Sequence, residues 1–456
     1  MLDLQTQLRE YGRQLDEMAP HPSPGDVIAG SDPAPAHRVF RHRSAWAFGA
    51  AFILTLGIVG SIWLLRTDNP AVDVVEEPIQ SIDFESLEWT RTPTSEVFGA
   101  GADVAAVTLG EPGFVAVGSV NGHAAVWTSP DALTWTRVRH DPEVFGGSGI
   151  ADVTVGGPGL VAVGQYDLER GTAPAVWTSP DGLSWSRFTT DNALGEKDGD
   201  RPWKWMQSVT TGGPGLVAVG SEHITLEGAW NFSTVGRVWT SPDGFTWTQV
   251  PHNPEIFGSA DSYETSSSID QVISAGPGLV AIGKLNGDAA VWTSREGRVW
   301  TPTTEGLTWT TTVIDGGSIG DVTTGGPGLV AVGGYELDQA CKAGTPLDCY
   351  AAVWTSVDGI TWDPVPHDDT VFGGGADKQG MSSVATVGTD LIAVGSAVWT
   401  SEDGINWTKI YHDPGFEVGE HSGMSYVFAA HETLIAFGEA ANDGHYVYVA
   451  TERPRG

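Results

Sequence analysis

Cysteine is nearly absent from this chain of 456 residues, which contains only Cys341 and Cys349. Two cysteines exclude a fold held together by several disulfides, such as a small secreted scaffold. The pair lies only eight positions apart. It therefore predicts a single bridge that closes a small loop, because such a bridge persists where the chain lies outside the cytoplasm.

Basic residues are also scarce. The chain carries 23 Lys and Arg against 57 Asp and Glu, a formal net charge of -34. Nucleic-acid phosphates are bound by clustered Lys and Arg, so this balance excludes nucleic acid as a partner. It also argues against docking of the folded part on anionic lipid.

One long hydrophobic run is present, at residues 45–65 (AWAFGAAFILTLGIVGSIWLL). It has the length that a helix needs to cross a bilayer. Arginines precede the run and acidic residues follow it, which predicts a cytoplasmic N-terminus. A cleaved signal peptide is the alternative, but the 44 preceding residues are too many for one.

These features predict a single-pass protein of the cell membrane with an extracytoplasmic folded domain. We expect a cytoplasmic tail at 1–44, made of a short helix and a disordered segment, and a transmembrane helix at 45–65. A linker at 66–84, a folded domain at 85–451 and a C-terminal tail at 452–456 complete the division.

Glycine and tryptophan are abundant, at 60 and 19 residues, and they recur in a repeated phrase. A glycine turn with L-V-A-V-G precedes V-W-T-S-P-D-G-x-T-W, as in GGPGLVAVG (156–164) and AVWTSPDGLSW (175–185). Each copy contains four strand signals, and Pro-Asp-Gly between two of them indicates a hairpin. Four antiparallel strands make one blade of a β-propeller. The V-W anchors lie 45 to 62 residues apart, at Trp127, Trp177, Trp239, Trp292, Trp354 and Trp399.

The two ends of the folded domain complement each other. Residues 425–451 supply three strands, whereas residues 87–93 (LEWTRTP) supply a spare fourth. Docking the spare strand on the last three would leave no open edge. The sequence therefore predicts an all-β fold, a seven-bladed β-propeller of four-stranded blades, preceded by one transmembrane α-helix. In the fourth copy, residues 305–309 (EGLTW) best match the outer strand, after an insertion.

The hairpin resembles the Asp-box, or BNR, repeat of sialidases and related propellers, whose pattern is S-x-D-x-G-x-T-W. The turn is one residue shorter here, with Gly directly after Asp. The resemblance implies that Ser and Asp tie the turn and that Trp packs between blades, which makes these residues structural. The matching residues are Ser129, Asp131, Trp135, Ser179, Asp181, Trp185, Ser241, Asp243, Trp247, Ser356, Asp358, Trp362, Ser401, Asp403 and Trp407.

Sialidase activity is not expected from this resemblance. The family's early [FY]-R-I-P motif is absent, and Arg91, Arg137 and Arg187 fall on outer strands, away from the centre. No catalytic residue stands out. Two alternatives stay open beside a binding module: another glycan-processing hydrolase that uses paired carboxylates, and a scaffold or assembly factor for an envelope complex.

Long insertions predict where a ligand would bind. They occur at residues 191–206, 221–236 and 335–350, all on the face opposite the Pro-Asp-Gly turns. Their aromatic side chains either stack on a sugar or peptide or pack the loops onto the propeller. The candidate binding residues are Trp203, Trp205, Trp230, Phe232 and Tyr335.

Histidine recurs in the connections between blades, each time before Asp or Asn, at His140, His252, His367 and His412. Because each copy is the same connection, the four should be spread around the ring rather than converge. The sequence therefore predicts no metal and no cofactor. We expect an extracytoplasmic ligand-binding or protein-interaction module whose partner is a protein or a glycan.

Overall fold

The computed structural model describes residues 84, 87–147, 149–169, 171–188, 203–213, 215–225, 232–259, 265–276, 278–294, 309–314, 317–335, 350–373, 380–411, 423–430, 433–440 and 444–452. The chain divides into two compact units, Met1–Glu76 and Glu77–Gly456, and every described residue lies in the second. The predicted tail at 1–44 and membrane segment at 45–65 lie outside the described residues. Within the described part, no helix has both the length and the apolar character to span a membrane.

Short antiparallel strands build the second unit, as expected from its glycine turns and aromatic, β-branched runs. Five sheets have four strands each. They contain β1 (Leu87–Pro93), β26 (Gly423–Ala430), β27 (Thr433–Ala440) and β28 (Gly444–Glu452); β2 (Ala102–Gly110), β3 (Gly113–Val120), β4 (His123–Ser129) and β5 (Thr136–Arg137); β14 (Ser267–Ala275), β15 (Gly278–Leu285), β16 (Asp288–Ser294) and β17 (Trp309–Ile314); β18 (Gly317–Gly325), β19 (Gly328–Tyr335), β20 (Tyr350–Ser356) and β21 (Asp363–Pro364); and β22 (Met381–Val387), β23 (Asp390–Gly395), β24 (Val398–Ser401) and β25 (Thr408–Tyr411).

The remaining eight strands form a single sheet. They are β6 (Ile150–Gly156), β7 (Gly159–Asp167), β8 (Thr172–Ser179), β9 (Ser186–Phe188), β10 (Trp203–Gly212), β11 (Gly215–Thr225), β12 (Phe232–Ser241) and β13 (Thr248–Gln249). Among the described residues, four helices of four residues each lie between strands, at α3 (Thr94–Val97), α4 (Pro142–Phe145), α5 (Pro254–Phe257) and α6 (Asp369–Phe372).

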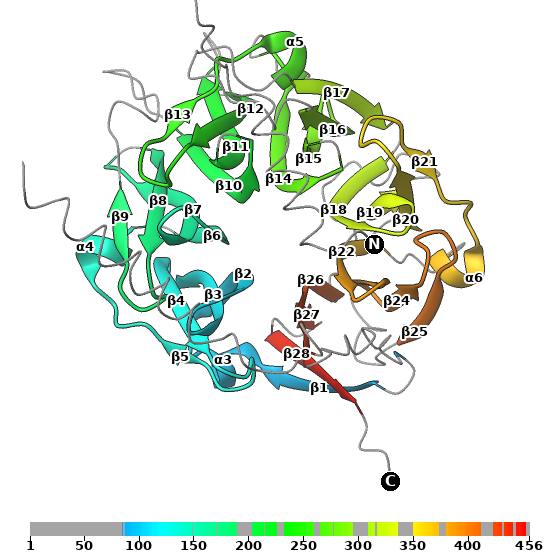
Figure 1. Cartoon of the computed structure of the whole chain (residues 1–456), viewed down its shortest axis with the longest axis horizontal. Helices are drawn as coiled ribbons and strands as arrows, with labels where there is room; N and C mark the ends of the chain where they lie inside the picture. The colour runs from blue at the N-terminus through cyan, green and yellow to red at the C-terminus, as the bar shows by residue number, and fades with distance from the viewer. Residues whose placement is uncertain are drawn as a thin grey trace, which may run out of the picture. The chain divides into compact units, whose positions relative to one another are not determined.

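The sheets of this unit are arranged in a ring (Figure 1), and the prediction of a repeat-built β-propeller is confirmed. The prediction of seven four-stranded blades is wrong, whereas the predicted transmembrane helix lies outside the described residues. Five four-stranded blades are present, and the strands β6 to β13 belong to one larger sheet. The described residues contain no counterpart of the membrane helix.

A parallel contact between β8 and β10 creates the larger sheet. Trp203 pairs with Thr172 in this register, and Thr172 Oγ1 donates to the carbonyl of Lys204 at 3.3 Å. Repeat spacing carries no information about such a contact, because the two strands belong to successive copies of the repeat. The repeat pattern therefore predicts two separate blades where the structure has one sheet of eight strands.

The first strand of the unit pairs with the last. β1 runs antiparallel to β28 over its full length, from Leu87 opposite Glu452 to Pro93 opposite Tyr446. Trp89 packs on the apolar cluster that includes Val427 and Leu434. The fourth strand of this sheet thus comes from the other end of the domain (Figure 1).

The inner strand of each copy lies nearest the centre of the ring and carries a β-bulge (Figure 1). The residue after the bulge accepts a hydrogen bond from a backbone N–H of the next inner strand. Asp152 Oδ2 accepts from Val209 at 2.9 Å, and Ser208 Oγ accepts from Val272 at 3.2 Å. Gln271, Asp321 and Ser383 accept in the same way from Val322, Val384 and Val427.

This series of polar side chains ties successive inner strands together around the axis. Tyr426 continues it with a bond to the backbone of Val107, whereas Ala106 has no side chain that can accept. Burial raises the pKa of Asp321, and it raises the pKa of Asp152 to about 6. The repeated pair of this residue and a following Val was visible in the sequence, and sequence reasoning missed it.

Candidate binding surface at the ends of strands β10, β11 and β12

Three of the predicted binding residues lie close together on one face of β10, β11 and β12. Trp205 contacts His223 edge-on with 4.8 Å between ring centroids, and His223 stacks on Phe232 at 4.1 Å. Trp203 lies directly opposite His223 in the strand register. We call Trp203, Trp205, His223 and Phe232 the aromatic cluster.

The outer members of the aromatic cluster face solvent. Trp203 is 48% exposed and Phe232 is 47% exposed, so both rings are open to solvent. His223 lies between them, and its partial burial lowers its pKa. The imidazole is therefore neutral at neutral pH, and the cluster presents an uncharged aromatic surface in a strongly acidic protein.

One other predicted binding residue, Tyr335, does not join this cluster. Tyr335 ends β19 in a different sheet, where it pairs with Tyr350. Trp230 lies outside the described residues, and so do Cys341 and Cys349. Sequence reasoning missed His223, although it lies in the same predicted insertion as Phe232.

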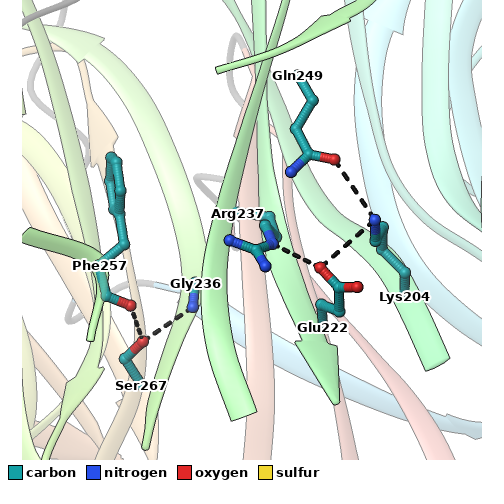
Figure 2. Close-up of polar contacts among 7 residues, drawn as sticks. All are labelled: Lys204, Glu222, Gly236, Arg237, Gln249, Phe257 and Ser267. Atoms are coloured by element: carbon teal, nitrogen blue, oxygen red, sulfur yellow. Dashed lines mark hydrogen bonds and ion pairs between the residues drawn. The ribbon is translucent and has the colours of Figure 1, made fainter. Parts of the chain in front are cut away.

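A cluster of charged residues lies on the opposite face of the same strands (Figure 2). Glu222 Oε2 accepts from Arg237 Nε at 2.6 Å and lies 3.4 Å from Lys204 Nζ. Gln249 Oε1 accepts from the same Lys204 nitrogen at 3.4 Å. Lys204 and Arg237 are buried, at 4% and 8% exposed. We call Lys204, Glu222, Arg237 and Gln249 the charged cluster.

The two faces follow from strand register, because successive side chains alternate between faces. Lys204 pairs with Glu222, and the next residue on each strand belongs to the aromatic side. On that side Ser267 of β14 accepts from the backbone N–H of Gly236 and donates to the carbonyl of Phe257 (Figure 2). A Cβ at Gly236 would approach Ile269 to 2.7 Å, so glycine allows this close contact between the sheets.

The Asp-box-like turns lie at the other end of the strands. In one, Asp181 Oδ1 accepts from the backbone N–H groups of Ser184 and Leu183 at 2.6 and 2.9 Å. These bonds lower the pKa of Asp181 to about 2. Trp185 Nε1 donates to the carbonyl of Gly182 at 2.9 Å. The same bonds recur in the turns of Asp131, Asp243, Asp358 and Asp403.

The recurring histidines lie in separate connections and pack on phenylalanine. His140, His252 and His367 lie 6.3, 6.2 and 5.9 Å from the rings of Phe145, Phe257 and Phe372. The following residue caps a short helix in each case, at Asp141, Asn253 and Asp368. His412 lies outside the described residues. Within the described part, no group of three or more His, Cys, Asp or Glu is placed to hold a metal.

The buried carboxylates of the inner strands hold the strands in place. Asp321 accepts from Gln271, Ser383 and two backbone N–H groups, and Asp152 accepts from Ser208 and two backbone N–H groups. Their carboxylate oxygens therefore accept hydrogen bonds that hold the inner strands together. The arrangement gives no specific support for a hydrolase that uses paired carboxylates.

Comparisons with known proteins concern the fold. The chain matches no protein-family model, and no curated protein is similar to it in sequence. The WD40 domain of Neurospora crassa Pan2 is similar to it with a TM-score of 0.47 and 10% identity, covering 80% of this chain and 96% of that one. A 6-phosphogluconolactonase-like protein from Bacteroides fragilis is similar with a TM-score of 0.45 and 13% identity, covering 74% and 91%. The WD40 propeller domain of Doa1 is similar with a TM-score of 0.34 and 12% identity, covering 77% and 93%.

Proposed function

We propose that this β-propeller is an interaction module that binds a protein or glycan partner through the aromatic cluster. The observation that carries the proposal is the nearly half-exposed pair Trp203 and Phe232 beside the neutral His223. Aromatic rings that are held in place and open to solvent supply large contact area at little entropic cost. Because they sit on paired strands, their positions are fixed before a partner arrives.

The acidic surface influences which partners fit. A net charge of -34 repels polyanions and favours neutral or basic partners. A neutral sugar ring or an apolar segment of a basic protein would stack on the uncharged aromatic cluster. This chemistry supports a glycan or protein partner rather than a nucleic acid.

Binding should depend on the exposed rings. We expect Trp203→Ala and Phe232→Ala each to weaken partner binding at least about tenfold, which corresponds to roughly 1.4 kcal/mol. The measurement is capture of glycans and envelope proteins by the full-length protein in detergent, followed by titration of the captured partner.

Phe245→Ala provides the matched control. Phe245 is 45% exposed, but it lies in the Asp-box-like turn beyond the other end of β12. The strand places it about 30 Å from Phe232. If Phe245→Ala weakened binding as much as Phe232→Ala, the aromatic cluster would not be the binding surface.

We also propose that residues 45–65 anchor the module in the membrane, with the propeller outside the cytoplasm. The uncharged length of the segment and the arginines before it support this proposal. The protein should sediment with membranes and resist alkaline extraction, and external protease should reach the propeller. Release of the intact protein by alkali would contradict the anchor.

A further inference from the structure

The aromatic cluster lies on a hairpin that is longer than the matching hairpin of the preceding copy. After its V-A-V-G segment, β11 continues for five residues, and Thr225 pairs with Phe232. After the same segment, β7 continues for three residues, and Asp167 pairs with Thr172. The added length places Phe232 beside His223, on strands that are fixed by backbone hydrogen bonds.

The side of β10, β11 and β12 that carries the aromatic cluster has no charge among its described residues. Directly paired residues share a face of the sheet, and so do residues two apart along a strand. The register therefore defines what we call the aromatic face, with the side chains of Trp203, Trp205, Ser221, His223, Thr225, Phe232 and Thr234. Because partial burial lowers the pKa of His223, its imidazole is neutral at neutral pH. The polar groups of this face are thus hydroxyls, indole N–H groups and one imidazole, all of them neutral.

The two most exposed rings of the aromatic face offer separate contacts. Trp203 lies on β10 and Phe232 on β12, with β11 between them. Two strand separations make about 10 Å, and an offset of two residues along the strand makes about 7 Å. The two Cα atoms are therefore roughly 12 Å apart. A ligand that contacts both rings must be extended.

The exposed aromatic area matches a small ligand better than a protein. A buried aromatic side chain removes about 150 to 250 Å² from solvent. Trp203 and Phe232 are each nearly half exposed, so together they present roughly 200 Å². A standard protein interface takes about 800 Å² from each partner, roughly four times as much. The two rings alone therefore fit a short oligomer.

A neutral oligosaccharide has the chemistry of this face. The C–H groups of a sugar ring pack on an aromatic ring, and the hydroxyls around the same sugar exchange hydrogen bonds with neutral side chains such as Thr225 and Thr234. Successive rings of one oligosaccharide reach two separate aromatic contacts. An acidic sugar would instead meet a chain with a net charge of -34.

We propose that a neutral oligosaccharide binds along the aromatic face, with one sugar ring on Trp203 and another on Phe232. Its hydroxyls bond to Thr225, Thr234 and His223. The contacts of His223 with Trp205 and Phe232 hold these rings in place before the sugar arrives. This inference rests on the proposed function and narrows its partner to one class, and a protein partner becomes an outcome of the test.

The first measurement is saturation-transfer NMR on the full-length protein in a detergent without a sugar headgroup. The neutral probes are maltotriose, cellotriose and tri-N-acetylchitotriose, each compared with its own monosaccharide and with trigalacturonic acid. We expect at least one neutral trisaccharide to bind saturably, at least about tenfold more tightly than its monosaccharide and more tightly than the acid. Absence of saturable binding by all three neutral trisaccharides would overturn the proposal.

Single variants test whether the two rings act together. Trp203→Ala and Phe232→Ala should each weaken the trisaccharide at least about tenfold and remove most of its advantage over the monosaccharide, because one ring contact remains. Phe245→Ala is the matched control, since Phe245 is similarly exposed beyond the other end of β12. An unchanged advantage in both variants, or an equal loss in Phe245→Ala, would contradict the proposal.

Hydroxyl variants separate a sugar from an apolar ligand. Thr225→Val and Thr234→Val keep the size of the side chain and remove one hydrogen-bonding group each. We expect at least one of them to weaken the trisaccharide roughly fivefold, as the loss of one hydrogen bond does. Thr248→Val on β13 is the control and should bind as the parent protein does. Unchanged affinity in both aromatic-face variants would overturn the assignment of a sugar.

Failure of this inference can be told apart from failure of the proposed function. Capture of a protein that depends on Trp203 and Phe232, without binding of any neutral trisaccharide, would overturn the oligosaccharide and leave the interaction module in place. If Trp203→Ala and Phe232→Ala changed the binding of neither a protein nor a trisaccharide, both proposals would fail.

Discussion

At the scale of single residues, one aspartate fixes each Asp-box-like turn. Asp243 Oδ1 accepts from Thr246 and Phe245 at 2.6 and 2.8 Å, which satisfies two backbone donors that would otherwise need water. Ser241 Oγ donates to the same carboxylate and accepts from Gly244. A structural role therefore follows from the two backbone N–H bonds to the aspartate, which recur at Asp131, Asp181, Asp358 and Asp403.

Removing the carboxylate should loosen the hairpin without dismantling the ring. We expect Asp243→Ala to lower the free energy of unfolding by about 1 kcal/mol, as loss of a helix cap does. Asp243→Asn keeps one oxygen acceptor and should lose less. Urea denaturation of both variants checks this, and equal stability of Asp243→Ala and the parent protein would contradict it.

Two kinds of aspartate act on stability in opposite directions. Burial raises the folded-state pKa of Asp152 from 3.8 to about 6, so the folded state binds more protons between these values. The free energy of unfolding then increases as pH falls from 6 towards 4. The pKa of Asp181 is lowered to about 2, so its contribution is present above pH 4 and lost as pH falls towards 2.

Asp152→Ser separates these effects. Ser208 and Ser383 show that serine accepts the same bond between inner strands. We expect the variant to show a smaller rise in unfolding free energy between about pH 6 and 4, because Asp321, whose pKa burial also raises, still contributes, and to keep the fall below about pH 4. Urea denaturation from pH 3 to 7.5 measures this, and an unchanged slope between pH 4 and 6 would show that Asp152 does not titrate there.

At the scale of strands and turns, the sequence predicted the hairpins because their signals are local. Pro-Asp-Gly turns and β-branched runs mark chain reversals within a few residues. The outer strand after a Pro-Asp-Gly turn is short, because β9 covers only Ser186–Phe188. The side chain of Asp181 holds Leu183 and Ser184 in the turn, and their backbone cannot pair with β8.

Strand β1 should stabilise the sheet that it forms with β26, β27 and β28, although it comes from the other end of the domain. Trp89 packs on the cluster that includes Leu434 and Tyr448, so Trp89→Ala should lower the free energy of unfolding by roughly 2 kcal/mol. Hydrogen exchange of the β28 amides should also accelerate. Trp203→Ala is the matched control, because Trp203 is half-exposed, and it should change stability by less than about 0.5 kcal/mol.

At the scale of the whole domain, repeat spacing predicted a propeller but not how its sheets join. The parallel contact of Trp203 with Thr172 links two copies of the repeat, and no local sequence pattern predicts it. The series of bonds from Asp152 to Tyr426 also spans copies, but its signal, one polar residue before Val in each inner strand, was present.

The candidate binding surface was also predictable only in part, because it depends on contacts between separate strands as well as on local sequence patterns. Insertion lengths and aromatic content pointed to Trp203, Trp205 and Phe232, whose neighbourhood depends on strands that flank the insertions. Tyr335 was grouped with them only because it begins another insertion, and the fold places it in another sheet. The buried pairing of Lys204, Glu222 and Arg237 required the register of three strands, which sequence periodicity leaves undetermined.

Site-specific photo-crosslinking in cells tests the proposed interaction surface most directly. A photoreactive amino acid would replace Phe232 in the aromatic cluster or, as the control, Phe245 at the far end of β12. We expect a discrete crosslinked partner from position 232 and none from position 245. The same crosslinked partner from position 245 alone, or equal yields from both positions, would contradict the assignment of this surface.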